Sequence, residues 1–545
     1  MKRNKSDGKS ERKYAEVIIP LTDVYDKGGR DVLEECGNKK GGVNLVVYPS
    51  IFNNMLEPGK SRRSYESLGG EDVTSFLKGV IDDKNMVREI PFLSGPGSGA
   101  EGAKAGDGIR VTLYRASPAL HVAYVDYPTA AEKDFSVTSL ERAIESWKVA
   151  DNDMPVLMTT KPKYHMKYKS RGLRVEDPAF MMVNADIVNN GIITGSEKLL
   201  SRLHDNNRVI KLDEAADILG KKLFLHQFIR FMSPQDEWAM VTGKLVKNPS
   251  GTRVTGFEDG LVKLVERGGK LHVGNYSMDS LLGIKPRDME QYIALQYGLL
   301  DPDTSLFFLC GSQGSGKTLL AYLAAVELML RYDANERILR KIDNGRNGSF
   351  EKMVLLKPND PMGGTKRDDG LLPGDLYTKT IQHLMPYVDA HKMSDLGSIF
   401  PFKDMFLHPV YSNDYGDKRS ENANKKIKNA AYLPNHQEVV ELVTSAKIRG
   451  RSLPNTILII DEAQNFTPYE MRTILSRLSE GCKAFVLGDP EQFDNPDCSR
   501  EVNGLTYAIK HYFGRLYVGL GHLTTNYRSQ ISEDANSMKA VSGRR

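Results

Sequence analysis

The chain has 545 residues, of which 40% are hydrophobic and 26% charged, and its mean hydropathy is −0.41. At about 150 residues per domain this length predicts three to four domains, and the composition excludes a wholly disordered or collagen-like chain. The 74 Lys and Arg residues outnumber the 70 Asp and Glu residues by only four, so the net charge neither requires nor excludes a nucleic-acid partner.

The first 13 residues are basic and polar, which predicts a solvated tail rather than a secretory signal or a membrane anchor. No stretch approaches the roughly 18 apolar residues of a membrane-spanning helix, so we expect a cytoplasmic protein with no membrane partner. The four cysteines form no CxxC pair, which argues against a disulfide framework or a zinc site and predicts reduced thiols.

Residues 14–177 follow an α/β pattern. Helical spacing predicts helices at 72–81 and 139–150, and the Gly-rich segment 94–108 predicts a loop inserted within the domain. Apolar runs with the length or the alternation of strands lie at 15–21, 43–50, 109–115, 120–126 and 155–160.

Residues 178–275 consist of short segments rich in Gly, Asn and charge, which predicts a small β-rich linker module with a turn at 247–252. From residue 276 onward, buried strands alternate with Gly-rich loops and helices. This texture predicts an α/β domain with a parallel sheet. Its candidate strands are 306–310, 352–357, 456–460 and 484–488, and its candidate helix is 319–330. The polar segment 407–435 is expected to be a mobile insertion.

One motif in this half binds phosphate in many proteins. GSQGSGKT follows an apolar strand and precedes an Ala/Leu-rich helix, which is the context that a P-loop requires. Backbone N–H groups of such a loop wrap the β-phosphate, the lysine reaches the β- and γ-oxygens, and the hydroxyl of the last residue ligates magnesium. The residues predicted to bind nucleotide are Gly311, Ser312, Gln313, Gly314, Ser315, Gly316, Lys317 and Thr318.

Hydrolysis also needs an acidic group at a strand end. Asp461 follows five apolar residues and is expected to bind magnesium together with Thr318, and Glu462 is expected to polarise the attacking water. A further strand leads to Gln492, a candidate sensor of the γ-phosphate. Arg528 could stabilise transition-state charge in its own or a neighbouring subunit.

The segments GSQGSGKT, IIDEAQ, GDPEQ and NYRSQ, in this order, resemble the core of superfamily 1 helicases and, more closely, the PhoH ATPases. The stretches KPRDMEQYIALQYGLL, KPNDPMGG with GLLPGD, and KIRGRSLPN resemble the same family, so that the similarity extends over roughly residues 283–532. The chain departs from the family pattern at Lys357, where the family usually has Arg, and in the extra residues 364–369 and 407–435.

This resemblance implies a RecA-like P-loop ATPase that uses ATP and Mg²⁺, acts on single-stranded RNA as a helicase, and forms a homo-oligomer such as a hexameric ring. It also implies that Gln291 reads adenine. From the residues themselves, Arg449 and Arg451 are candidates for phosphate contacts, and a solvated basic loop is the alternative.

The N-terminal half resembles a PIN nuclease domain less closely, through its second strand at 43–60 and its last strand and helix at 156–178. PIN chemistry needs three or four clustered carboxylates to hold divalent metal. The matching positions fall near Leu21, with Asp23 two residues further on, at Asn54, near Thr138 and at Lys161.

Most of these positions are not acidic, and a lysine would repel the cation, so we expect a PIN-like fold that has lost nuclease activity. Such a fold could serve as an RNA-binding or assembly module. Its candidate basic stripe, for which a solvated face is the alternative, consists of Lys161, Lys163, Lys167, Lys169 and Arg171.

The sequence thus predicts an α/β protein with a RecA-like P-loop core, preceded by a PIN-like domain and a small β-rich module. The leading function is ATP hydrolysis coupled to RNA binding, remodelling or unwinding. Two alternatives stay open: an ATP-gated RNA-binding or assembly protein that never translocates, and an ATP-driven ribonuclease. The predicted divisions are 1–13 (tail), 14–177 (PIN-like), 178–275 (linker module) and 276–545 (PhoH-like ATPase).

Overall fold

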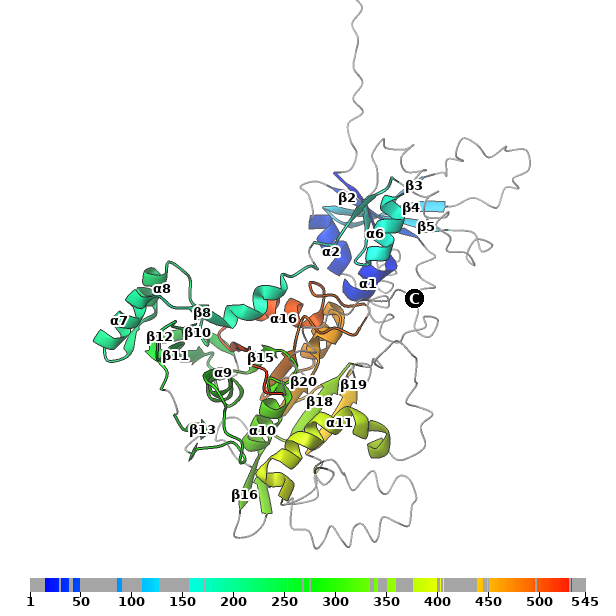
Figure 1. Ribbon diagram of the computed structural model, residues 1–545. Helices are drawn as coiled ribbons and strands as arrows, with labels where there is room; N and C mark the ends of the chain where they lie inside the picture. Colours follow the sequence, from blue (N-terminus) through cyan, green and yellow to red (C-terminus); the bar gives the residue numbers. More distant parts are fainter. Residues whose placement is uncertain are drawn as a thin grey trace, which may run out of the picture. The chain divides into compact units, whose positions relative to one another are not determined.

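The computed structural model divides the chain into two compact units (Figure 1). The first unit is Met1–Met182 with Thr467–Glu470, and the second is Val183–Phe466 with Met471–Arg545. The structure describes residues 15–28, 31–38, 43–49, 86–90, 110–126, 156–170, 172–179, 181–251, 253–266, 269–273, 276–333, 338–341, 350–358, 376–398, 402, 405, 439–444, 448, 450–495, 497–528 and 531.

The first unit contains a seven-stranded mixed sheet in the order β3-β4-β5-β2-β1-β6-β7. Strands β5, β2, β1, β6 and β7 run parallel, and β4 joins β5 and β3 in antiparallel pairs. Each of the five strand segments predicted here contains a strand. The strands are β1 (Val17–Pro20), β2 (Asn44–Pro49), β3 (Met86–Ile90), β4 (Arg110–Ser117), β5 (Leu120–Asp126), β6 (Val156–Met158) and β7 (Arg174–Glu176).

The described helices of this unit are α1 (Thr22–Gly28), α2 (Asp31–Asn38) and α6 (Pro162–Lys169). Apolar residues of β1, β2 and β6, such as Ile18, Val46 and Leu157, are completely buried and form the centre of the unit. The predicted helices 72–81 and 139–150 and the Gly-rich loop 94–108 lie outside the described residues. The PIN-like character of this unit stays a prediction.

The second unit is built on a six-stranded sheet in the order β19-β18-β20-β21-β15-β22, in which every pair is parallel. The four predicted parallel strands are confirmed, and two strands, β19 and β22, were not predicted. The strands are β15 (Leu306–Gly311), β18 (Lys352–Lys357), β19 (Val440–Thr444), β20 (Thr456–Ile460), β21 (Lys483–Gly488) and β22 (Val518–Leu523).

Both faces of this sheet are buried, which explains why its strands are continuously apolar. Alternate residues of each strand enter different cores: Phe307 and Leu309 of β15 pack on one side, and Phe308 and Cys310 pack on the other. On the first side, α10 and α11 contact each other along the sheet (Figure 1). The helices of this unit are α9 (Met289–Ala294), the π-helical turn η2 (Leu295–Leu299), α10 (Lys317–Met329), α11 (Leu376–Met393), α15 (Pro468–Leu475), α16 (Gly504–Tyr512) and the short 3-10 turns η1 (Ala185–Gly191), η4 (Asp395–Ser398) and η7 (Ala463–Asn465).

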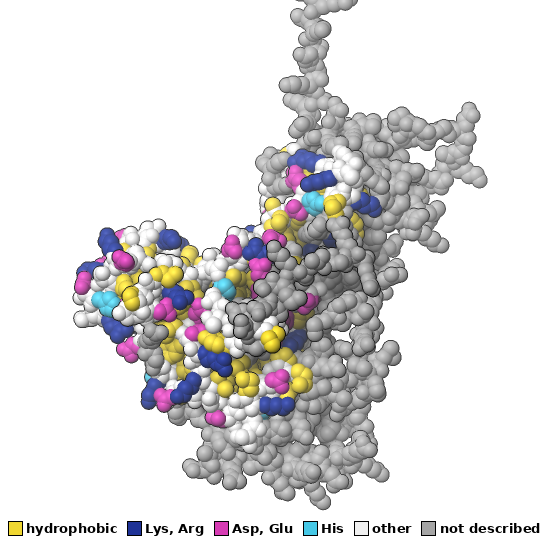
Figure 2. Space-filling model, in the orientation of Figure 1, with side chains coloured by type: hydrophobic (Ala, Val, Ile, Leu, Met, Phe, Trp, Pro, Cys, Tyr) yellow, Lys and Arg dark blue, Asp and Glu magenta, His cyan; other side chains and the backbone are white. Residues whose placement is uncertain are grey.

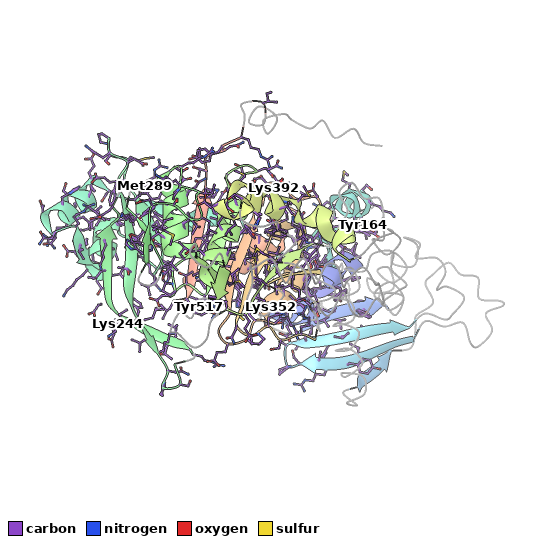
Figure 3. The ribbon with its side chains drawn as sticks, turned by 90° about the horizontal axis from the view of Figure 1, so that it is seen from below. Tyr164, Lys244, Met289, Lys352, Lys392 and Tyr517 are labelled. Atoms are coloured by element: carbon purple, nitrogen blue, oxygen red, sulfur yellow. The ribbon has the colours of Figure 1, made fainter. Side chains whose placement is uncertain are left out.

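Residues 192–264, within the predicted linker module, form a five-stranded sheet with two helices in the same compact unit as the large sheet. Its order is β8-β10-β11-β12-β9, and β11 and β12 form a long hairpin that turns at Asn248–Gly251, inside the predicted turn. Lys244 lies on this hairpin (Figure 3). The elements are β8 (Ile192–Thr194), α7 (Glu197–Asp205), β9 (Val209–Lys211), α8 (Leu212–Leu219), β10 (Phe228–Arg230), β11 (Trp238–Lys247) and β12 (Val254–Leu264).

Two small antiparallel ribbons complete the second unit: β13 (Leu271–Val273) with β14 (Tyr276–Met278), and β16 (Leu330–Asp333) with β17 (Ile338–Lys341). Among the described residues, no helix is both long and apolar enough to cross a membrane. All four cysteines are free thiols.

Candidate functional site

The predicted phosphate loop lies between β15 and α10, so the strand–loop–helix order expected around the motif is present. Gly316 is the N-cap of α10, and its carbonyl accepts the first helical bond, from the N–H of Leu320. The hydroxyl of Ser315 donates to the carbonyl of Ser312 at 2.8 Å and closes the loop on itself. The N-terminal end of α10 therefore faces the space that the loop encloses, as anion binding requires.

Lys317 extends back over this loop. Its Nζ donates to the carbonyl oxygens of Gly311 at 2.6 Å and Ser312 at 2.9 Å. Burial lowers the pKa of Lys317, and the nearby carboxylates of Glu462, Asp489 and Asp461 partly oppose this effect. The ammonium is thus held at the loop with acidic groups around it.

Asp461 follows β20 directly and is 3% exposed. Its two carboxylate oxygens lie 3.4 and 3.5 Å from the hydroxyl of Thr318, the second residue of α10. Two residues 143 positions apart, both predicted as magnesium ligands, therefore meet at the carboxyl edge of the sheet.

Two residues to which the sequence analysis gave no role at the site also contact Asp461. The hydroxyl of Tyr387, on α11, donates to Oδ2 at 3.2 Å, and Nζ of Lys357, at the end of β18, lies 3.6 Å from the same oxygen. Burial and the charge of Asp461 raise the pKa of Tyr387 well above its ordinary value, so its hydroxyl keeps its proton and acts as donor.

Glu462 has a left-handed backbone, with φ of +54°, and its side chain is exposed. Incomplete hydration of the carboxyl group and the adjacent Asp461 raise its pKa, against the opposing effects of Gln464 and Lys317. Its Oε2 accepts a hydrogen bond from the side-chain amide of Gln464 at 2.7 Å. Glu462 is therefore oriented from its own loop.

Gln464 was also missed, although it stands two residues after Glu462. The same amide nitrogen donates to the carbonyl of Gln492 at 2.7 Å, and its Oε1 accepts the N–H of Asp489 at 3.0 Å. The backbone of Gln492 is thereby connected to Glu462, whereas no described contact gives its side chain the sensor role that we predicted.

Gln291, on α9, lies against the P-loop. Its Nε2 donates to the carbonyl of Ser315 at 3.0 Å, and its Oε1 accepts the N–H of Arg287 at 2.9 Å. Both ends of the amide are engaged within the protein, so the structure shows it bracing the loop, and its reading of adenine stays a prediction.

The segment around Arg528 packs on the P-loop of the same chain. The N–H of Tyr527 donates to the carbonyl of Gly314 at 3.1 Å. Gly314 has φ of +89°, and a Cβ there would lie 2.5 Å from Oδ1 of Asn526 and 2.7 Å from Cγ of Arg528. Only glycine permits both this backbone and this close approach.

Comparison with known proteins finds similarity in this region. Residues 283–534 match the protein-family model described as PhoH-like protein. We call this matched region the PhoH-like domain. The chain is 32% identical to Protein PhoH2 of Bacillus subtilis (strain 168) over 256 residues, which is 47% of each chain. It is 29% identical to a PhoH-like protein of the same strain over 213 residues, 39% of this chain and 50% of that one. It is 26% identical to Protein PhoH of Escherichia coli (strain K12) over 270 residues, 48% of this chain and 60% of that one. It thus spans about half the length of these relatives.

The PhoH family has a P-loop nucleotide-binding core, and the residues of this PhoH-like domain fit magnesium. Hydroxyl and carboxylate oxygens are the ligands that Mg²⁺ prefers, and it usually takes one or two of them together with phosphate oxygens. Thr318 and Asp461 supply such a pair beside the loop. Among the described residues no group of three His, Cys, Asp or Glu side chains could hold a metal.

The side chain of Arg451 is engaged by another residue of the chain. Its guanidinium forms a two-pronged pair with Glu441, at 2.6 and 3.0 Å, and Lys352 contacts the same carboxylate at 2.8 Å. Arg451 thus forms an internal ion pair at β19, and its phosphate contact stays a prediction. Arg449 lies outside the described residues.

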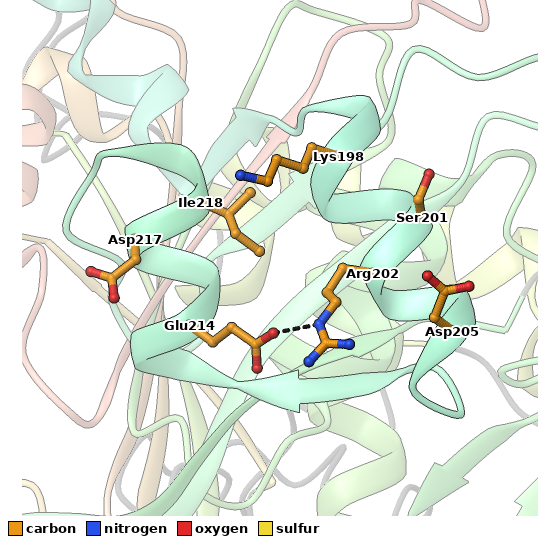
Figure 4. A pocket seen from close by; sticks show the side chains of 7 residues that line it. All are labelled: Lys198, Ser201, Arg202, Asp205, Glu214, Asp217 and Ile218. Atoms are coloured by element: carbon orange, nitrogen blue, oxygen red, sulfur yellow. Dashed lines mark hydrogen bonds and ion pairs between the residues drawn. The ribbon is translucent and has the colours of Figure 1, made fainter.

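A pocket of about 750 Å³ lies away from the P-loop, between α7 and α8 (Figure 4). Arg202 and Glu214 form an ion pair at 2.5 Å within it. Acidic, basic and apolar side chains alternate over this part of the surface (Figure 2), so the pocket favours no ligand of one charge. Its lining is Lys198, Ser201, Arg202, Asp205, Glu214, Asp217 and Ile218.

In the first unit Asp23 is the single described acid among the positions matched to a PIN site. It is 2% exposed, and its carboxylate accepts hydrogen bonds from both hydroxyl groups of Thr159 and Thr160 and from the N–H of Thr160, at 2.7 to 3.1 Å. Nζ of Lys27 donates to the Thr160 hydroxyl at 2.6 Å. Asn54 and Thr138 lie outside the described residues, and Lys161 precedes α6.

Of the predicted stripe, Lys167 and Lys169 lie exposed on α6. Arg171 and the side chain of Lys163 lie outside the described residues. The structure therefore leaves both the RNA-binding and the solvated-face interpretation of this stripe open.

Proposed function

We propose that the PhoH-like domain hydrolyses ATP with Mg²⁺ and couples hydrolysis to RNA binding or remodelling. One observation carries the ATPase part: Lys317, Thr318, Asp461 and Glu462, which come from two distant segments, meet at the carboxyl edge of one parallel sheet. Ligands of open parallel sheets bind at this edge.

The residues divide the work by their chemistry. The loop and the ammonium of Lys317 bind the phosphates, and the hydroxyl of Thr318 and the carboxylate of Asp461 hold Mg²⁺, which neutralises charge on the γ-phosphate when bound. Glu462 orients and polarises the attacking water. Arg528, which lies against Gly314 of its own chain, supplies positive charge to the transferred phosphate in cis.

The coupling to RNA is supported by the resemblance of four motifs to superfamily 1 helicases and by the contacts of Gln464. This side chain bonds both Glu462 and the backbone of the 489–492 loop, so we expect a change at the water-polarising carboxylate to be transmitted to that loop. A linkage of this kind is what an ATPase needs if nucleotide state is to alter RNA affinity.

The test compares wild type with Lys317→Ala and Glu462→Gln. We expect Lys317→Ala to lose nucleotide binding, and Glu462→Gln to bind ATP but hydrolyse it at least about 100-fold more slowly. Single-stranded RNA should accelerate wild-type hydrolysis, and strand displacement on a tailed RNA duplex separates unwinding from ATP-gated binding. ATP turnover that no RNA changes would refute the coupling and leave the ATPase intact.

For the first unit we propose a binding or assembly role without nuclease chemistry. The carboxylate of Asp23 accepts the hydroxyl groups of Thr159 and Thr160 and the N–H of Thr160, and the last matched position is Lys161, which would repel a divalent cation. We expect no manganese-dependent cleavage of RNA by the full-length chain. Cleavage that disappears in Asp23→Ala but survives in Lys317→Ala would reverse this assignment.

A further inference from the structure

The carboxylate of Asp461 is held through both of its oxygens. Oδ1 accepts the N–H of Glu462 at 3.1 Å, and Oδ2 accepts the hydroxyl of Tyr387 at 3.2 Å. Because the two donors act on different oxygens, they fix the rotation of the carboxylate. The hydroxyl of Thr318 then lies almost equally far from the two oxygens, at 3.4 and 3.5 Å.

Tyr387 comes from an element that is separate from both nucleotide-binding segments. Its ring is buried and meets Tyr322 of α10 edge to face, with 6.1 Å between ring centroids. A phenylalanine would fill the same space, so packing accounts for the ring but not for the hydroxyl. A buried hydroxyl requires a hydrogen-bond partner, and here that partner is Asp461.

Lys357 adds a charge to the same oxygen. Its Nζ lies 3.6 Å from Oδ2 of Asp461 and 5.5 Å from the centre of the Tyr387 ring. An ammonium at this distance neutralises the carboxylate and opposes the approach of a second cation. Tyr387 and Lys357 therefore act on Asp461 in opposite ways, one by orientation and the other by charge.

We propose that Tyr387 is a positioning residue that orients Asp461 toward Thr318 for Mg²⁺, and that Lys357 is the counter-charge that limits how tightly this pair binds the metal. The inference rests on the proposed function of the PhoH-like domain. It makes magnesium affinity depend on α11 and on the end of β18, neither of which carries a nucleotide-binding motif.

The experiment measures binding of ADP carrying a fluorescent N-methylanthraniloyl group to the full-length chain as a function of MgCl₂. In Tyr387→Phe the half-saturating Mg²⁺ concentration should rise about tenfold, in the range found when partners of metal ligands are removed. Binding measured in EDTA should be unchanged. The same titration with MnCl₂, followed by electron paramagnetic resonance, reports the metal directly.

Tyr322→Phe is the matched control. Tyr322 is equally buried, belongs to the same ring pair, and its hydroxyl bonds Nδ1 of His391 at 2.8 Å instead of Asp461. It should leave the half-saturating Mg²⁺ concentration within about twofold of wild type. A Tyr387→Phe titration that coincides with that of Tyr322→Phe would overturn the inference.

Lys357→Met provides the second test, including the case in which Tyr387→Phe does not fold. Loss of the ammonium should lower the half-saturating Mg²⁺ concentration about threefold, the opposite direction to Tyr387→Phe, and Lys357→Arg should restore the wild-type value. An unchanged or raised value contradicts the counter-charge role. Wild-type binding that does not respond to Mg²⁺ at all would count against the proposed function itself.

Discussion

Two aspartates of this chain follow buried parallel strands, and their surroundings differ. Asp461, after β20, has a P-loop hydroxyl within 3.5 Å of both oxygens and Lys317 nearby. Asp23, in the first turn of α1 after β1, accepts hydrogen bonds from the hydroxyl groups of Thr159 and Thr160 and from one backbone N–H. Asp461 is a candidate metal ligand because its neighbours include a P-loop hydroxyl and the phosphate-binding lysine, whereas the hydrogen bonds of Asp23 come from Thr159 and Thr160.

The largest difference in ATP hydrolysis should appear when these two aspartates are replaced separately. Asp461→Asn should reduce ATP hydrolysis roughly 10³-fold, because magnesium supplies several kcal/mol of transition-state stabilisation. Asp23→Ala should leave hydrolysis unchanged but lower the free energy of unfolding by about 3 kcal/mol, since it leaves buried hydrogen-bond donors without an acceptor. Steady-state kinetics and urea unfolding of both variants measure these two effects. The comparison fails if Asp23→Ala impairs hydrolysis without loss of stability.

The next largest effect on ATP hydrolysis is expected from replacing Arg528. Because its side chain lies against Gly314 of the same chain, Arg528→Ala should lower kcat roughly 10²-fold and leave nucleotide affinity nearly unchanged. Mixing this variant with Lys317→Ala distinguishes the two geometries. No activity should return on mixing if the arginine acts in cis, whereas recovery would show that a neighbouring subunit supplies it.

Gly314→Ala should weaken nucleotide binding about tenfold, because a Cβ at φ of +89° is strained and would force Asn526 and Arg528 away from the loop. Gly220→Ala is the control. Gly220 has φ of +61°, and no atom lies within 4 Å of the position that a Cβ would take there. That control should cost about 1 kcal/mol of stability and leave nucleotide binding intact, as a fluorescence titration would reveal.

Much of this site could be predicted because its signals are local. GSQGSGKT and IIDEAQ each carry their strand and loop in one short segment, so the positions of Lys317 and Asp461 followed from the sequence. Tyr387 could not be found this way, because nothing in the spacing of α11 distinguishes it from an ordinary core residue. Gln464 could have been found, since an amide two residues from Glu462 is within reach of it.

The same limit applies to the fold. Continuously apolar segments predicted β15, β18, β20 and β21, whereas β22 contains Gly519, Gly521 and His522, which weaken its strand signal. These glycines lie against Phe307 of β15, where a Cβ at either position would come within 3.0 Å of the ring. Their small size is a requirement of the neighbouring strand, which local sequence cannot show.

Two lysines extend the comparison between polar groups at the nucleotide site and polar groups elsewhere in the fold. Burial lowers the pKa of both Lys317 and Lys483. Lys317 borders the space within the P-loop, whereas Nζ of Lys483, at the start of β21, donates to the carbonyl oxygens of Gly298, Asp301 and Thr304. Lys483 is therefore expected to act on stability alone.

The smallest effect is the pH dependence that follows from Lys483. Burial lowers its pKa from 10.5 to about 8, which corresponds to roughly 3 kcal/mol. A lowered pKa means that the folded state releases the proton first, so the contribution to stability is present above pH 10.5 and is lost as the pH falls through 8. Relative to Lys483→Met, the wild type should therefore gain stability between pH 8 and pH 10.5. Urea unfolding of both proteins across this interval measures the gain, and parallel curves would show that burial does not lower the pKa of this ammonium.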